Sequence, residues 1–231
     1  MITLYLYPGL FGLEDNNPFG LKVVTFLKLT KVPFEMKHIV DTSKAPRGQL
    51  PYMEIDGEIT SDSNEMIEKI TKTYQLLIDN TLSEKEKALD FAIRRMLDEH
   101  LYWVMSYSRW QDETYWPRFE QAFIETFPNM QKGDLDGFRE NNIKKYQMQG
   151  IGRYSPEDVY KKGTQDLKII ETLLSDEDYF FGKTLHTIDA CIYGFLANIY
   201  YYEIETPLRS FIQKSAKLSN YLKKVHVLVS K

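Results

Sequence analysis

Residues 48–70 read GQLPYMEIDGEITSDSNEMIEKI, and their pattern indicates how the first third of the chain folds. Two short β-rich runs in it are separated by Asp56-Gly57, a dipeptide typical of a two-residue hairpin turn. The residues that follow, 61–74, place apolar side chains at helical spacing. The stretch therefore predicts a strand, a tight turn, a second strand and a helix.

The sequence before this stretch predicts two more strands with a helix between them. Residues 2–7 are β-rich and end at a Pro-Gly pair. Pro18 suits the first turn of a helix, which Pro33 stops. Residues 34–40 predict the second strand, and a polar loop leads from it to the hairpin. The element order is then β-α-β-β-β-α, and we predict an α/β domain.

From Ser83 onward the pattern is helical. Ser83 and Glu86 form a capping box, in which a serine oxygen and a glutamate carboxylate satisfy free amides at a helix start. Apolar residues then recur at three- and four-residue steps as far as Tyr107. Further helices are predicted over 119–127, 136–149, 155–174 and 184–202 and through 218–225. We therefore predict two domains, an α/β domain over 1–77 and an all-α domain over 83–231, joined by a linker over 78–82.

The composition excludes several classes of protein. A net charge of -4 leaves no basic surplus for a nucleic-acid backbone. The apolar stretches are shorter than the ~18 residues of a membrane span, and no signal-peptide pattern opens the sequence. The single cysteine, Cys191, rules out an internal disulfide framework and is typical of a reducing compartment. We expect a cytoplasmic protein that binds neither nucleic acid nor membranes.

Four segments, taken together and in order, resemble the glutathione transferase superfamily. They are a helix start, the turn before Tyr52, an Asp-Ser pair at the next helix start and a late capping motif, at residues 17–22, 48–52, 62–63 and 182–190. The resemblance implies a thioredoxin-like N-terminal domain followed by an all-helical domain. Residues 44–52, 96–103, 109–110 and 149–155 resemble more specifically the metaxin-like branch of this superfamily, close to the "failed axon connections" family.

The resemblance implies that glutathione is the co-substrate. Leu50, before a cis Pro51, would pair its backbone with the extended tripeptide. Asp62 would pair with the ammonium group, and the Ser63 hydroxyl with the helix-start amides would hold the α-carboxylate. Gln49 is expected at the glycine carboxylate. The alternative is purely structural: the Asp-Ser pair would only cap a helix, and the proline would only make a turn.

Three cations are further candidates. Lys44 and Arg47 would help to hold the glycine carboxylate, or else belong to a solvated basic loop. Arg109 lies on the long helix that would line an electrophile pocket between the domains, where its charge would favour a thiolate. A surface ion pair with Asp112 or Glu113 is the alternative for Arg109.

At the position that stabilises the nucleophile, the sequence departs from the family pattern. The related classes have Cys, Ser or Tyr there, whereas this chain has Asn17. Lowering a thiol pKa from ~8.5 by about two units requires roughly 2.7 kcal/mol. A hydrogen bond to a charged group contributes about 1.5–3 kcal/mol, and a helix start adds ~0.3–1 kcal/mol. Asn17 with the helix amides is therefore sufficient, and Asn16, Tyr5 and Tyr7 are alternatives for the role.

Other reactive residue types have structural interpretations. His100 falls on the apolar stripe of its helix, which favours a core histidine over a catalytic base. Cys191 lies in an apolar run, and buried cysteine is usually inert packing. The four histidines show no metal-ligand spacing, so we expect no metal site.

We predict a glutathione transferase-like enzyme that conjugates or reduces a small hydrophobic electrophile through a thiolate stabilised by Asn17. The alternative is a non-catalytic interaction module of the metaxin type, which Asn17 favours because it stands where a hydroxyl or thiol is usual. A ligand-holding carrier is the third hypothesis. The superfamily also implies a homodimer.

Overall fold

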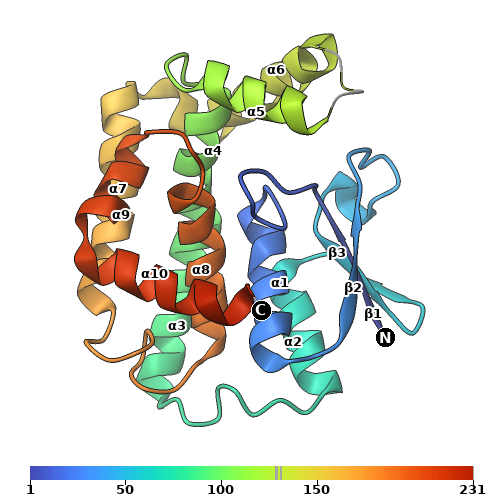
Figure 1. The fold of residues 1–231 in the computed structure, drawn as a ribbon, viewed down its shortest axis with the longest axis vertical. Helices are drawn as coiled ribbons and strands as arrows, with labels where there is room; N and C mark the ends of the chain where they lie inside the picture. Colours follow the sequence, from blue (N-terminus) through green and yellow to red (C-terminus); the bar gives the residue numbers. More distant parts are fainter. Residues whose placement is uncertain (128–129, 131, 231) are drawn as a thin grey trace.

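The computed structural model describes residues 1–127, 130 and 132–230, and its two parts differ in architecture (Figure 1). The four strands of its sheet lie before residue 61, and each described element from residue 84 onward is helical. This arrangement confirms the predicted fold class, an α/β region followed by an all-helical region. Residues 74–83, which include the expected linker, lie in neither a helix nor a strand.

The four strands form one mixed sheet in the order β2-β1-β3-β4, with the bounds β1 Ile2–Leu6, β2 Phe34–His38, β3 Tyr52–Ile55 and β4 Glu58–Thr60. β1 pairs with β2 in parallel and with β3 antiparallel. Asp56 and Gly57 make the predicted turn between β3 and β4, with φ of 51° and 82°. Both residues need positive φ in a turn of this type, which is why Asp-Gly is favoured there.

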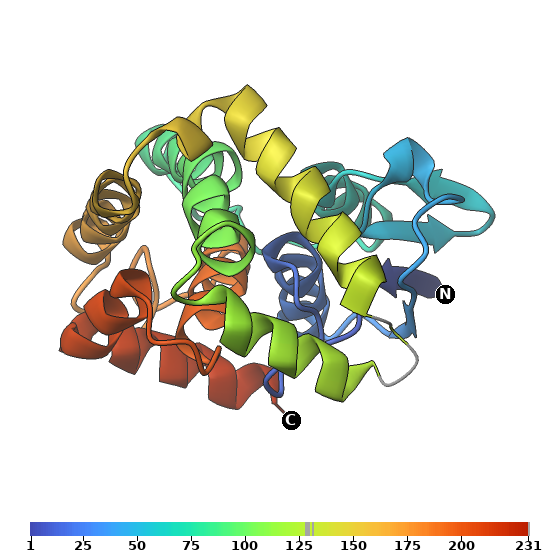
Figure 2. The ribbon, with the colours of Figure 1, turned by 90° about the horizontal axis from the view of Figure 1, so that it is seen from above.

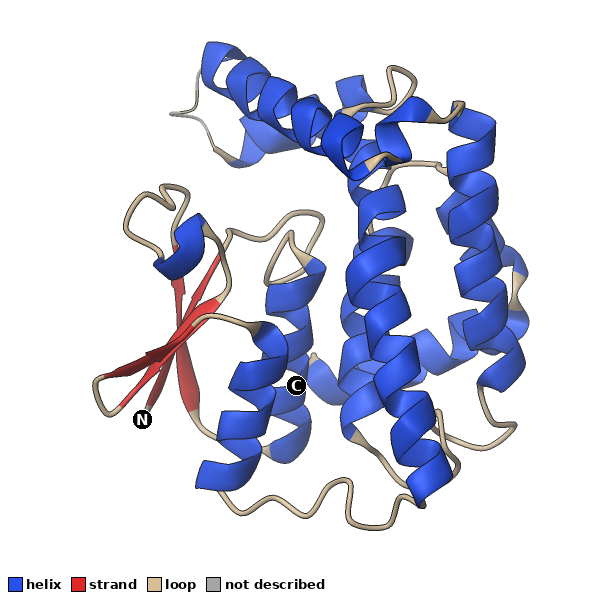
Figure 3. Ribbon diagram, turned by 180° about the vertical axis from the view of Figure 1, so that it is seen from behind, coloured by secondary structure: helices blue, strands red, loops and turns tan. Residues whose placement is uncertain are grey.

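Two helices, α1 (Pro18–Thr30) and α2 (Ser63–Thr73), pack on one face of this sheet (Figure 3). Leu4 and Leu6 of β1 are fully buried against them. Because side chains alternate along a strand, Tyr5 points to the opposite face. Only one face of the sheet therefore packs into the hydrophobic core.

The opposite face of the sheet carries no helix in the part of the chain that the structure describes (Figure 3). On it, Tyr5 stacks on Tyr52 with ring centroids 4.2 Å apart, and the Lys37 ammonium lies 5.4 Å from the Tyr5 centroid. The loop between β2 and β3 forms only a short 3-10 turn, η1 (Pro46–Gly48). β2 is consequently an edge strand that is largely exposed.

The long helix predicted after Ser83 is continuous but irregular. It runs as α3 (Glu84–Met96), a π-helical segment η2 (Leu97–Leu101) and α4 (Tyr102–Trp110). The capping box at its start is confirmed, since the Ser83 N–H donates to Glu86 (2.8 Å) and the Glu86 N–H to the serine oxygen (3.3 Å). A π turn holds one more residue than an α turn, so the residues after it change face.

The remaining helices surround this one, and α5 and α6 extend across one end of the molecule (Figure 2). Their bounds are α5 Trp116–Thr126, α6 Lys132–Gln149, η3 Ile151–Arg153, α7 Pro156–Leu173, α8 Thr187–Tyr200, α9 Pro207–Lys214 and α10 Ala216–Val229. The sequence analysis did not predict α9. Among the described residues, no helix is both long and apolar enough to cross a membrane.

The two regions meet where α1 crosses α8 (Figure 1). α8 is buried along its length except at Tyr200. At the crossing, a Cβ added to Gly194 would lie 2.8 Å from the backbone nitrogen of Lys22. The absence of a side chain at Gly194 therefore lets the two backbones approach, and this contact holds the start of α1 against the helical region.

Candidate functional site

The start of α1 is capped by Asn17. Its Oδ1 accepts the Phe19 N–H at 2.9 Å, and its own N–H donates to the Asp15 carboxylate at 2.8 Å. Pro18, the first helical residue, has no N–H, and the next amide is used by the cap. The expectation that the first amides of α1 add to thiolate stabilisation is therefore wrong for these two residues.

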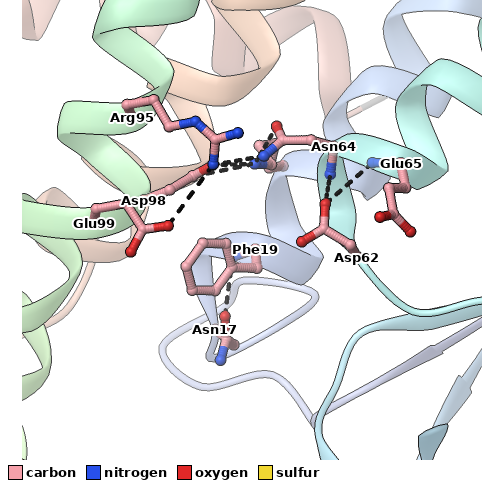
Figure 4. A network of polar contacts seen from close by, with 9 residues as sticks. Asn17, Phe19, Asp62, Asn64, Glu65, Arg95, Asp98 and Glu99 are labelled. Carbon is pink, nitrogen blue, oxygen red and sulfur yellow. Dashed lines mark hydrogen bonds and ion pairs between the residues drawn. The ribbon is translucent and has the colours of Figure 1, made fainter. Parts of the chain in front are cut away.

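The Asn17 side chain still has a donor to offer. No hydrogen bond among the described residues uses its amide nitrogen, which Figure 4 shows directed away from the Phe19 contact. The side chain is half-buried, so a ligand can reach it. One such hydrogen bond to a charged sulfur is worth about 1.5–3 kcal/mol, which corresponds to a thiol pKa lowered by about one to two units.

The start of α2 is capped in the same way by Asp62. One carboxylate oxygen, Oδ1, accepts the N–H groups of Asn64 (2.8 Å) and Glu65 (3.1 Å). The second oxygen, the Ser63 N–H and the Ser63 hydroxyl have no partner among the described residues. The structural alternative and the binding role are thus compatible, because capping occupies only one oxygen of Asp62.

The segment before β3 has the shape that the resemblance implies. The Leu50–Pro51 peptide bond is cis. No hydrogen bond in the described part of the chain uses the Leu50 backbone, although its side chain is buried. Gln49, Lys44 and Arg47 are exposed in the preceding loop. The cis peptide bond and the Leu50 backbone lie directly before β3, whereas Lys44 and Arg47 are exposed to solvent.

A buried ionic network ties these two helix starts to the helical region. Lys22 of α1 is fully buried, and its Nζ lies 3.2 Å from Asp98 and 3.1 Å from the Asn64 amide oxygen. The Asn64 amide nitrogen donates to Asp98 at 2.8 Å. Figure 4 shows Asn64 directly beside the Asp62 cap and Asp98 reaching it from η2. The network fixes α1, α2 and η2 relative to one another.

Sequence reasoning missed this network. A lysine among the apolar residues of α1 is a signal for a buried cation, because lysine is almost never fully buried unless it is paired. The partner could not be identified from the sequence, since Asp98 is 76 residues away. Only the π turn of η2 and the packing of the two regions bring the charges together.

The alternatives to Asn17 are placed differently. The Asn16 amide donates to the Pro8 carbonyl oxygen at 2.9 Å, so its donor is in use. Tyr5 lies on the open face of the sheet, away from α1. Tyr7 lies just after β1, and burial raises the pKa of its phenol to about 12, with Tyr102 and Asp15 adding to the rise. Tyr7 is therefore a neutral hydroxyl donor at ordinary pH.

Arg109 is buried between the regions rather than facing solvent. Its guanidinium donates to the Asn16 carbonyl oxygen at 2.8 Å and to the Asn198 side-chain oxygen at 3.1 Å, and its carbon lies 3.8 Å from the Tyr202 ring centroid. The alternative of a surface ion pair with Asp112 or Glu113 is wrong. Arg109 holds the loop before Asn17 against α8, and its guanidinium lies between that loop and α8.

Asp15 is a second buried charge that the sequence did not reveal. It is fully buried, and one oxygen has no partner in the described part of the chain. Burial raises the pKa of the Asp15 carboxyl well above its ordinary value, and hydrogen bonds from the Asn17 and Tyr7 amides oppose the rise. A Cβ at Gly20 would lie 1.7 Å from Asp15, so only glycine fits there.

The remaining reactive side chains offer little chemistry at this site. Cys191 is buried, and burial raises the pKa of its thiol to about 12, which confirms its interpretation as inert packing. Among the described residues no group of three or more His, Cys, Asp or Glu side chains could hold a metal ion. What the site presents is a set of hydrogen-bond donors and one free carboxylate oxygen.

Comparison with known protein families gives two matches. The family models "Glutathione S-transferase N-terminal domain" and "Glutathione S-transferase, C-terminal domain" match residues 18–115 and 163–225. The isoprene-epoxide–glutathione S-transferase of Rhodococcus sp. (strain AD45) is 32% identical, over 97% of this chain and 98% of that protein. This relative is similar over essentially its full length.

Other relatives lie in the metaxin-like group. Failed axon connections of Drosophila melanogaster is 27% identical over 92% of this chain and 54% of that protein, and metaxin-1 of Bos taurus is 24% identical over 85% and 64%. Among solved structures, glutathione transferase GSTFuA3 from Phanerochaete chrysosporium superposes with a TM-score of 0.64 at 14% identity, over 98% of this chain and 96% of that one. The chain therefore belongs to the glutathione S-transferase superfamily, as a metaxin-like member.

Proposed function

We propose that this protein binds glutathione along Leu50 and Pro51 and conjugates it, through its sulfur, to a small hydrophobic electrophile. The free oxygen of Asp62 pairs with the ligand ammonium, and the Ser63 hydroxyl and N–H hold its α-carboxylate. Gln49 reaches the glycine carboxylate. The observation that carries the proposal is the set of unused groups at the start of α2, one acceptor and two donors side by side.

The reaction needs a thiolate, and Asn17 supplies one hydrogen bond to it. The relative named as an isoprene-epoxide transferase suggests an epoxide as the electrophile class. The thiolate sulfur bonds to an epoxide carbon, the carbon–oxygen bond breaks, and the oxygen takes a proton. Tyr7 is our candidate donor of that proton, because its phenol stays protonated at neutral pH. We propose that the protein acts as a homodimer in the cytoplasm.

Calorimetric titration with glutathione tests the binding step. Ser63→Ala should weaken binding about tenfold, because a hydrogen bond to a charged group is lost. Ser61→Ala, in the same loop but outside the proposed contacts, is the matched control and should bind like wild type. Conjugation of a chloronitroarene and of a small epoxide is then measured separately. Absence of binding at millimolar glutathione, or equal losses in both variants, would remove this site.

The interaction-module alternative rests on two observations. The Asn17 side-chain oxygen Oδ1 is accounted for as a helix cap, and Failed axon connections and metaxin-1 are among the relatives. A module of this type predicts no glutathione binding and no conjugation in wild type. A ligand carrier predicts binding without turnover. The same titration and rate measurement therefore separate the three functions.

A further inference from the structure

A cavity lies in the helical region, away from the start of α1. Its volume is about 390 Å³, and residues of η2, η3 and α7 line it. This volume falls within the ~300–1,000 Å³ typical of small-molecule sites. The proposed glutathione contacts do not include any of its lining residues.

His100 of η2 contributes an imidazole to this cavity. Its Nδ1 lies 2.6 Å from the carboxylate of Asp166, which is 6% exposed. The carboxylate fixes the ring and its tautomer, so the other nitrogen, Nε2, remains for a ligand. The His100 side chain is 43% exposed, and the interpretation as a core histidine is therefore wrong. The π turn of η2 is the cause, because it moves His100 off the apolar stripe.

Two cations converge on the same cavity. The Lys162 ammonium lies 4.6 Å from the Tyr154 ring centroid, and neither Lys162 nor Arg153 forms an ion pair within the described residues. The Arg153 Nε donates to the Gln147 carbonyl oxygen at 2.9 Å, which orients the guanidinium and leaves its two terminal nitrogens unused. By contrast, Lys168 on the same helix α7 pairs with an acidic neighbour at 2.6 Å.

The charges of the cavity do not cancel. Lys162 and Arg153 carry two positive charges and Asp166 one negative charge, so one positive charge is in excess. A planar guanidinium and an ammonium together suit an oxyanion, which accepts several charge-assisted hydrogen bonds. The Tyr154 ring and the Ile151 side chain supply an apolar wall.

We propose that this cavity binds a small organic anion whose phosphate or carboxylate group is held by Lys162 and Arg153, with His100 lining the cavity beside it. The ligand's apolar body lies against the Tyr154 ring. The site is separate from the proposed glutathione contacts and does not depend on them.

Calorimetry on the full chain with three probes of similar shape tests this proposal. Phenyl phosphate and benzoate distinguish the two oxyanion sources, and benzyl alcohol is the uncharged match. At least one anion should bind saturably at millimolar concentration, shift the backbone amide resonances of Gly150 and Ile151, and bind equally in saturating glutathione. Benzyl alcohol should produce neither a shift nor heat.

Variants assign the binding to the named residues. Lys162→Ala and Arg153→Ala should each weaken the anion about tenfold, the loss of one charge-assisted contact. Lys161→Ala removes an exposed neighbour that does not line the cavity and should have no effect. Unchanged melting temperatures show that the variants fold. The proposal is overturned if neither anion binds, if benzyl alcohol binds equally well, or if Lys161→Ala weakens binding as much as Lys162→Ala.

Discussion

The helices α1 and α2 begin with the same kind of cap but leave different groups for a ligand. At α1, the Asn17 side-chain oxygen Oδ1 accepts the Phe19 N–H, and Pro18 has no N–H to offer. At α2, Asp62 caps with one oxygen and keeps the other, and the Ser63 hydroxyl and amide are both unused. One start therefore retains a single donor, whereas the other retains an acceptor and two donors.

This difference separates binding from catalysis in physical terms. Several unused groups of complementary charge at the start of α2 suit a zwitterion, which needs an anionic and a cationic contact. The lone amide nitrogen of Asn17 is worth about 1.5–3 kcal/mol toward a thiolate. The proposed binding of glutathione thus rests on several groups, whereas the proposed activation of its thiol rests on one side chain. The variants below test this difference between the two helix starts and are given in decreasing order of expected effect.

Asp98→Ala removes the network that holds both helix starts. We expect it to lower the free energy of unfolding by about 3–5 kcal/mol, because it leaves the fully buried Lys22 without its charged partner. Chemical denaturation measures the change. Glu99→Ala, at an exposed position on the same turn, is the control and should cost less than about 1 kcal/mol. The network has no such role if the two variants are equally stable.

Asn17→Asp keeps the helix cap but removes the amide donor. We expect the pKa of the bound glutathione thiol to rise by at least about one unit, because a hydrogen bond worth about 1.5–3 kcal/mol is lost and a negative charge is added. The pH dependence of conjugation measures this shift. Stability should stay near wild type, since aspartate caps as well as asparagine does. An unshifted pH profile would show that Asn17 only caps the helix.

Asp62→Asn is the corresponding change at the start of α2. Asparagine keeps the cap and removes the charge that would pair with the ligand ammonium. We expect glutathione affinity to fall about three- to tenfold, the worth of a partly exposed ion pair of about 1 kcal/mol, with kcat at saturation little changed. Glu65→Gln, exposed on the same turn, serves as the reference. Equal affinities in the two variants would count against Asp62 as a ligand contact.

Asp15→Asn tests the buried carboxyl behind Asn17. Because the folded-state pKa of Asp15 is raised, its favourable contribution is present at low pH and is lost as the pH rises. The variant does not titrate at this position, so its stability relative to wild type should increase as the pH rises above about 4, the ordinary carboxyl pKa, by up to about 1.4 kcal/mol per pH unit. Denaturant unfolding at several pH values checks this, and a gap that stays constant with pH would contradict it.

Local features of the fold were predictable because they depend on neighbouring residues. The Asp56-Gly57 hairpin turn and the Ser83–Glu86 capping box occur where the sequence predicts them. Other elements required tertiary context. The sequence analysis placed no helix over α9, a short helix of Pro207–Lys214 that packs against α7 and α8. The π turn of η2 is equally invisible, since its apolar residues continue a helical pattern on both sides.

The candidate site likewise combines features that neighbouring residues predict with features that depend on tertiary contacts. The two helix starts were predictable from local sequence, because Asn17-Pro18 and Asp62-Ser63 are cap signals that act within one turn of the chain. Which of their groups stay unused depends on how the helices pack in three dimensions. Only the tertiary structure joins Lys22 to Asp98 and turns His100 toward Asp166, since contacts between residues far apart in the chain depend on how whole elements pack.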